Sequence, residues 1–194
     1  MLPAVRLSVV LLAVLTLVGC HGSNFVRPAD DEFKLGKATH SQVAEKMGAP
    51  QTTSESLFPG TGKRLTEEQY IYATYGAGRV RRQLYFFYHD VLVGRQFTSN
   101  FPEDSSDWNE FKVDDLVKGK TTRSEVIEML GHPSGAYIWP AVPKTSGEAI
   151  GYHYFYATRE YSVFAKRLVR HSKDLIIIFD EQDRILAIDY RKKD

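Results

Sequence analysis

The sequence predicts an α+β protein made of two tandem units, each with two short helices packed on one face of a three-stranded antiparallel sheet. Two observations predict this helix-helix-strand-strand-strand order: the chain repeats itself, and in each copy a capped helical segment precedes aromatic strands. We divide the chain into a first unit at residues 33–98, a polar linker at residues 99–112 and a second unit at residues 113–194.

The repeat is clearest where each unit should form a helix. Residues 36–50 read GKATHSQVAEKMGAP and residues 119–133 read GKTTRSEVIEMLGHP, so eight of fifteen positions are identical at a constant offset of 83. Later, YIYAT at residues 70–74 returns as YFYAT at residues 154–158. Because the similar blocks occur in the same order, we interpret them as a duplication.

Each repeated segment carries the signals that begin and end a helix. Thr39 and Thr122 are candidate N-caps, and the residues three positions later, Gln42 and Glu125, would complete a capping box. Both segments then reach a Gly and, two residues later, a Pro. These residues suit a left-handed C-terminal position and prevent the helix from continuing.

Three strands are expected after each capped helix, and a further short helix is expected before it. The strands are runs rich in aromatic and β-branched residues, closed by polar turns. The expected strands cover residues 69–75, 83–88 and 91–98 in the first unit and 151–158, 174–179 and 185–190 in the second, and the extra helices lie around residues 31–35 and 108–117.

The N-terminus has the order of a bacterial lipoprotein signal peptide. Arg6 precedes a largely apolar run of twelve residues, and Gly19 stands directly before Cys20, the only cysteine. Twelve residues span about 18 Å as a helix, too short for a hydrocarbon core of about 30 Å. The motif LVGC that ends at Cys20 looks like a lipobox. We therefore expect residues 1–19 to be removed.

The mature chain would begin at a lipidated cysteine. In lipoproteins of this kind Cys20 would carry two or three acyl chains, palmitate among them, which anchor a protein stably. Residues 20–32 are short and polar, and we interpret them as a tether. His21 follows the cysteine where an Asp would influence sorting, which implies an outer-membrane location facing the periplasm.

The motifs of the second unit carry a resemblance to a known family. They are LVKGKT at residues 116–121, the capped helix, LGHP at residues 130–133, an aromatic strand and a closing hairpin. This arrangement resembles the BamE (SmpA/OmlA) family over residues 113–190, and less closely over residues 33–97. The resemblance implies a small outer-membrane lipoprotein accessory to the machinery that folds β-barrel proteins. Such proteins carry one unit, and the doubled form is similar to the β-lactamase-inhibitor-protein fold.

Strand alternation indicates which side chains could bind a partner. Ala73 and Ala157 share one parity with apolar neighbours, and small side chains suit the face on which helices pack closely. The tyrosines would then project from the opposite face, where they either anchor a protein partner or stack across strands. They are Tyr70, Tyr72, Tyr152, Tyr154 and Tyr156.

Basic residues cluster in one expected connection of each unit. Arg79, Arg81 and Arg82 lie in the first, and KRLVR at residues 166–170 lies in the second. One hypothesis is contact with anionic phospholipid, and the alternative is an ordinary solvated loop.

Enzyme chemistry has little support in the sequence. The six histidines show no metal-ligand spacing, no Gly-x-Ser-x-Gly motif occurs, and GTGK at residues 60–63 lacks the other residues of a phosphate-binding loop. With 25 basic against 24 acidic residues, no positive field indicates nucleic acid. We therefore expect no catalytic residue, metal, cofactor or nucleic-acid partner.

The sequence thus predicts a non-catalytic, lipid-anchored outer-membrane lipoprotein that binds another envelope protein, with the β-barrel assembly machinery as the candidate partner. The alternative function is that of a tethered inhibitor or sensor, which would grip a periplasmic enzyme with the concave face of its sheet.

Overall fold

The computed structural model describes residues 24–58, 61–74, 78–143, 149–162, 164 and 166–193. The predicted signal peptide and Cys20 lie outside the described residues. In the described part, no helix has the length and apolar character needed to cross a bilayer.

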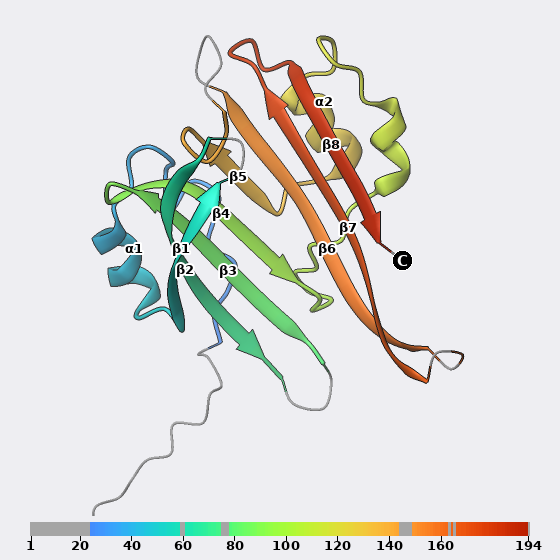
Figure 1. Ribbon diagram of the computed structural model, residues 1–194, viewed down its shortest axis with the longest axis horizontal. Helices are drawn as coiled ribbons and strands as arrows, with labels where there is room; N and C mark the ends of the chain where they lie inside the picture. The colour runs from blue at the N-terminus through green and yellow to red at the C-terminus, as the bar shows by residue number, and fades with distance from the viewer. Residues whose placement is uncertain are drawn as a thin grey trace, which may run out of the picture.

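One antiparallel sheet forms the body of the protein, and its strands follow one another across the sheet in chain order (Figure 1). In the described part of the chain three short helices accompany it: α1 (His40–Met47), the 3-10 helix η1 (Glu110–Asp115) and α2 (Arg123–Leu130). The strands are β1 (Thr52–Phe58), β2 (Lys63–Ala73), β3 (Val80–Tyr88), β4 (Val91–Ser99), β5 (Gly135–Ile138), β6 (Ile150–Ser162), β7 (Arg167–Phe179) and β8 (Ile185–Lys193).

The predicted fold class of two helix-helix-strand-strand-strand units is therefore wrong. All six expected strands are present, but β1 adds an edge strand beside β2, and β5 pairs with both β4 and β6 and so joins the two halves into a single eight-stranded sheet. The helix expected around residues 31–35 is a series of turns, and that expected around residues 108–117 is a six-residue 3-10 helix. Strand β1 was not predicted because its side chains are mostly exposed and polar, and β5 was not predicted because it has four residues.

Both predicted capping boxes are present. The Thr39 and Thr122 hydroxyls accept from the backbone N–H of Gln42 and Glu125, whose side chains accept from the N-cap N–H in return. After each helix a glycine adopts a positive φ, +76° at Gly48, with ψ far outside the left-handed helical region. This backbone region is essentially restricted to glycine. Its steric limits therefore explain why a glycine follows the helix in each repeat.

Two apolar clusters lie between the sheet and the helices, on the side that we call the helix face. Beneath α1, Val43 packs on Tyr70, Tyr85, Phe87 and Leu92 of the sheet. Beneath α2 and η1, the buried cluster consists of Trp108, Leu116, Val126, Leu130, Tyr154, Leu175, Ile177, Phe179 and Ile185. Because each helix has only two turns, this packing is what stabilises it.

A third cluster lies on the opposite side, which we call the open face because no helix in the described chain packs there. Its centre is Tyr137 of β5, which is buried with Phe86 and Val142. Glycines let the ring approach the neighbouring strand: a Cβ on Gly94 would lie 2.5 Å from Tyr137 Cδ1. Since real Cβ atoms do not come this close, the glycine is required where β4 meets β5.

Candidate partner-binding face

Strand register fixes which side chains share the open face. On β2, β3 and β4, Ile71, Arg82 and Thr98 face one another across the sheet, and in the next row Gln69, Leu84 and Gln96 do so. The second row continues through β5, β6 and β7 as Gly135, His153 and Ile176. Alternate residues of each strand project to the same side.

The predicted exposure of two tyrosines is wrong. Tyr70 is 2% exposed and Tyr154 is fully buried, and both lie on the helix face. The Tyr70 hydroxyl donates to the carbonyl of Gly48 at 3.2 Å, and that of Tyr154 donates to Gly131 at 3.0 Å. Large rings thus fill the space beneath the two helices, and their hydroxyls bond to carbonyls at the helix ends that have no partner within the helix.

The other three tyrosines are half-buried on the same helix face and not on the open face. Tyr72 stacks on Phe101 with ring centroids 5.8 Å apart. Tyr152 contacts Phe179 edge-on, and burial raises its pKa. The Lys173 ammonium lies over the Tyr156 ring, with Nζ 5.8 Å from the ring centroid. The face assignment from sequence was therefore inverted for the whole set.

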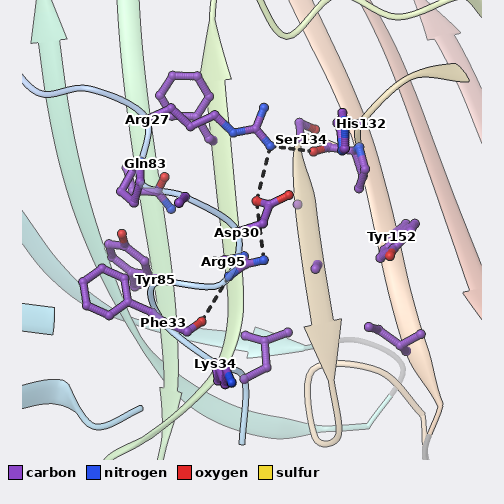
Figure 2. Close-up of a pocket in the computed structure, with 18 of the residues that line it drawn as sticks. Arg27, Asp30, Phe33, Lys34, Gln83, Tyr85, Arg95, His132, Ser134 and Tyr152 are labelled. Carbon is purple, nitrogen blue, oxygen red and sulfur yellow. Dashed lines mark hydrogen bonds and ion pairs between the residues drawn. The ribbon is translucent and has the colours of Figure 1, made fainter. Parts of the chain in front are cut away.

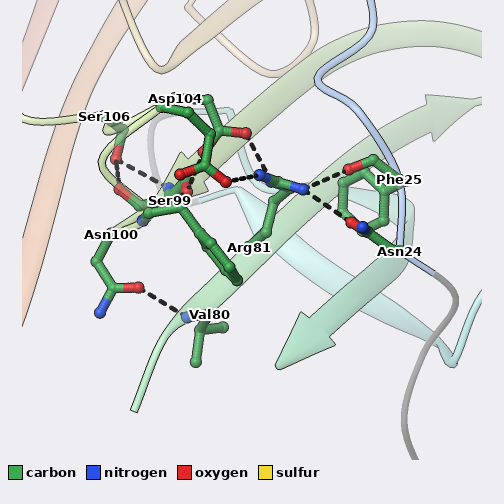
Figure 3. Close-up of polar contacts among 10 residues, drawn as sticks. Asn24, Phe25, Val80, Arg81, Ser99, Asn100, Asp104 and Ser106 are labelled. Atoms are coloured by element: carbon green, nitrogen blue, oxygen red, sulfur yellow. Dashed lines mark hydrogen bonds and ion pairs between the residues drawn. The ribbon is translucent and has the colours of Figure 1, made fainter. Parts of the chain in front are cut away.

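The arginine cluster does not act as one surface. Arg79 is exposed, but Arg81 and Arg82 belong to β3 and point to opposite faces. Arg81 is 6% exposed, with Nε 2.6 Å from Asp104 Oδ2 as an ion pair, and it donates to Asn24 and to the carbonyl of Phe25 (Figure 3). The predicted contact of Arg81 with anionic phospholipid is wrong, because its guanidinium is already bonded to Asp104, Asn24 and Phe25 of the protein.

Arg82 instead projects from β3 onto the open face, in register with Ile71 and Thr98. Within the described residues its guanidinium has no hydrogen bond or ion pair, although the side chain is half-buried. Burial lowers the pKa of Arg82, the carboxylate of Glu67 opposes this, and the nearby cation Arg170 lowers it further. Two cations of distant strands thus lie close enough to repel, on the face where none of the described helices packs.

Polar pairs and apolar side chains surround these cations. Tyr137 donates to Gln96 at 2.9 Å, and His153 Nε2 lies 2.9 Å from Asp174 Oδ1. Phe155 follows on β6 with its ring 5.9 Å from that of His153. Ile176 of β7 is 37% exposed. Aromatic and arginine side chains are the types enriched at protein interfaces, whereas lysine and glutamate are depleted there.

Sequence reasoning missed the approach of Arg170 to Arg82 and the pairing of His153 with Asp174. The register of the β6–β7 hairpin would have indicated the second pair, because Phe155 faces Asp174 and places it diagonally from His153. No local signal could have indicated the approach of Arg170 to Arg82, because it depends on how the sheet curves between β3 and β7. Among the described residues, no three His, Asp or Glu side chains are placed to hold a metal ion.

The fold and this face define the class: an antiparallel meander with short helices on one face and an open face that bears cations and apolar side chains. The chain matches no known family, and no curated protein matches it either. Among solved structures it is similar to a candidate β-lactamase inhibitor protein from Streptococcus mutans, with 13% identity and a TM-score of 0.40. That similarity covers 79% of this chain and 82% of the other.

Proposed function

We propose that this chain is a lipid-anchored outer-membrane lipoprotein, facing the periplasm, that binds another envelope protein through the open face without catalysis. The anchor rests on the sequence, in which Arg6, an apolar run and Gly19 precede Cys20. The binding role rests on one observation above all: a half-buried Arg82 without a polar partner among the described residues.

An acidic side chain of the partner would complete this site. A half-buried guanidinium gains from hydrogen-bond acceptors, and a carboxylate supplies two of them in matching geometry. Arg170 adds a second cation, so the face attracts negative charge. Phe155 and Ile176 provide apolar contact around the charged centre, as at interfaces where a few residues carry most of the affinity.

The partner that we propose belongs to outer-membrane protein assembly, and the resemblance of the capped-helix motif to the BamE family supports it. Deletion of the protein should then lower the levels of barrel proteins and sensitise cells to large antibiotics. Normal levels and normal sensitivity would contradict the assembly role. Capture of one soluble periplasmic enzyme with lowered activity would instead support the alternative, an inhibitor or sensor.

The open face is tested by site-specific photocrosslinking in intact cells. A photoreactive residue in place of Thr98, beside Arg82 on the open face, should give one discrete adduct, and the same residue at exposed Glu128 on α2 should not. Arg82→Glu should abolish the adduct. The matched change Arg79→Glu, at an exposed arginine outside the face, should leave it intact. An adduct that survives Arg82→Glu, or that forms equally at Glu128, would contradict the proposal.

The anchor is tested separately. Cys20→Ser should release the protein from membranes, and continued membrane retention would contradict lipidation.

A further inference from the structure

The outer part of the β6–β7 hairpin extends beyond the strands beside it. In the described chain β5 pairs with β6 only as far as His153, and β8 pairs with β7 only as far as Ser172. Beyond these points, among the described residues, the two strands pair only with each other, up to Ser162 and Arg167. The hairpin therefore projects from one end of the sheet, the end at which β3 begins (Figure 1).

The tip of this hairpin carries exposed apolar side chains. Phe164, in the turn, is fully exposed, and Leu168 of β7 is 64% exposed. Val80, the first residue of β3, is 41% exposed at the same end of the sheet. Apolar groups gathered at the end of a projecting element indicate contact with a protein or a membrane.

Positive charge surrounds the tip. Residues 159–170 contain four basic residues and one acidic residue. Lys166, Arg167 and Arg170 are exposed, and within the described part of the chain none of them forms an ion pair. Arg159 faces Arg170 directly across the hairpin, an arrangement of like charges that destabilises a strand pair. An anionic surface would relieve this repulsion.

The two ends of β7 differ in charge. Residues 166–170 include three basic residues and no acidic one, whereas the turn at residues 180–183 includes three acidic residues and no basic one. An anionic surface would therefore attract the hairpin tip and repel the turn after β7, which favours an orientation with the tip toward that surface.

The described N-terminal segment begins at the same end of the sheet. The Asn24 side chain accepts a hydrogen bond from Arg81, the second residue of β3. Hydrogen bonds made by Arg27 and Arg95 then hold the segment along the helix face (Figure 2). Cys20 precedes Asn24 by four residues, which reach at most about 14 Å. A lipid anchor at Cys20 would therefore hold the bilayer near the end from which the hairpin projects.

We propose that the tip of the β6–β7 hairpin docks on an anionic phospholipid surface, with the Phe164 ring at the apolar layer and Lys166 and Arg167 at the phosphates. This inference rests on the proposed anchor at Cys20, which makes docking intramolecular, so that a contact too weak to hold the protein alone is sufficient. The docked hairpin holds the sheet upright on the bilayer and leaves the open face accessible to a protein partner.

The test places an environment-sensitive nitrobenzoxadiazole label at the tip of the mature lipoprotein, in which lipidation blocks the thiol of Cys20. The labelled Phe164→Cys variant is reconstituted in vesicles of phosphatidylcholine alone or of equimolar phosphatidylcholine and phosphatidylglycerol. Its emission should shift to the blue only with phosphatidylglycerol, because the label then enters the apolar layer. The same label in Phe111→Cys, at an 86% exposed position on η1, should not shift. Equal emission in both kinds of vesicle at residue 164, or an equal shift at residue 111, would overturn the proposal.

Neutral substitutions in the labelled Phe164→Cys protein test the charges. Lys166→Gln combined with Arg167→Gln should lower the ratio of docked to undocked tip about 25-fold and remove the blue shift, since each cation near an anionic leaflet is worth roughly a fivefold change. The matched pair Lys118→Gln and Lys120→Gln, at exposed positions before α2, should retain the shift. Persistence of the shift without the tip cations, or an equal loss in the matched pair, would overturn the proposal.

Flotation with the vesicles reports the anchor separately. A protein that floats without the blue shift would overturn the docking of the tip and leave the anchor at Cys20 intact. A protein that stays in solution would contradict the anchor and, with it, the docking.

Discussion

Beneath α1 and beneath α2 the chain uses the same tyrosine in the same way. Tyr70 and Tyr154 both rise from the sheet to bond the glycine carbonyl that ends the helix, at Gly48 and Gly131. The backbone entering each helix also docks equivalently, with the N-cap residues forming bridges to Val91 at the start of β4 and to Arg184 just before β8. The duplication in sequence is thus a duplication of local packing, within one continuous sheet.

The residues beside these tyrosines differ between the two sites. Beneath α1, the carboxylate of Glu68 is 2% exposed and lies 2.5 Å from His40 Nε2. In the matching positions beneath α2 stand Tyr152 and Arg123, and Arg123 pairs with Asp183 at 2.9 Å in a partly exposed setting. The tyrosine is shared because it completes the helix end, whereas its polar neighbours vary provided that each one has a partner.

The largest expected effect tests the tyrosine that is shared by the packing beneath α1 and beneath α2. Tyr154→Ala removes a fully buried ring and a hydrogen bond, and we expect a loss of about 3–5 kcal/mol in the free energy of unfolding. Tyr70→Ala should cost a similar amount. Urea unfolding followed by circular dichroism measures both.

The half-buried Tyr72 provides the control for this comparison. Tyr72→Ala should cost clearly less, because its ring is partly exposed. A small loss at either Tyr70 or Tyr154 would show that the two helix ends are not equivalent in energy.

The next effect tests the polar pairs that differ between the two regions, His40 with Glu68 beneath α1 and Arg123 with Asp183 beneath α2. Among the described residues, His40→Ala leaves the buried Glu68 carboxylate with only the Tyr70 hydroxyl at 3.4 Å, and we expect a loss of about 2–3 kcal/mol. Arg123→Ala breaks a pair whose aspartate is 51% exposed, so the loss should stay below about 1 kcal/mol. Both values come from urea unfolding at neutral pH.

A double variant separates the buried carboxylate from the rest of the histidine. His40→Ala combined with Glu68→Leu removes both polar partners, and it should recover part of the stability lost in His40→Ala. If the double variant is less stable than the single one, the cost arises elsewhere, for example from the contact of His40 with Phe87.

Local signals in the sequence were sufficient for the elements that depend on them. The Thr39 and Thr122 capping boxes follow from side-chain chemistry within four residues, so they could be read directly. Which face a strand buries depends on what packs there, and alternation alone cannot decide it. Tyr70 was assigned to the wrong face because small residues were taken as the helix contact.

The candidate site was harder to predict than the elements. Arg81 and Arg82 are adjacent and chemically identical, yet one is paired with Asp104 and the other faces outward without a described partner. Where β3 begins decides this difference, and the sequence placed the start three residues too late. The approach of Arg170 to Arg82 depends on sheet curvature, which no local pattern encodes.

The smallest expected effect concerns the two capping boxes, which differ in one titratable group. The Glu125 carboxylate accepts from the N–H and hydroxyl of Thr122, and these bonds hold its pKa below the ordinary value. Its contribution to stability is therefore complete above the ordinary glutamate pKa and is lost as the pH falls through the lower pKa of the folded state. Gln42, its counterpart in α1, accepts the same bond from Thr39 without titrating.

Exchanging the two cap residues isolates this effect from the other carboxylates. The difference in Tm between the protein and its Glu125→Gln variant should be larger at pH 7 than at pH 3, because acid removes the charge that the variant lacks. Gln42→Glu should transfer the same acid sensitivity to α1, where the box geometry is already present. Thermal unfolding by circular dichroism at both pH values measures these differences. A Glu125→Gln difference that is constant with pH would mean that Glu125 caps α2 through geometry alone, as Gln42 caps α1.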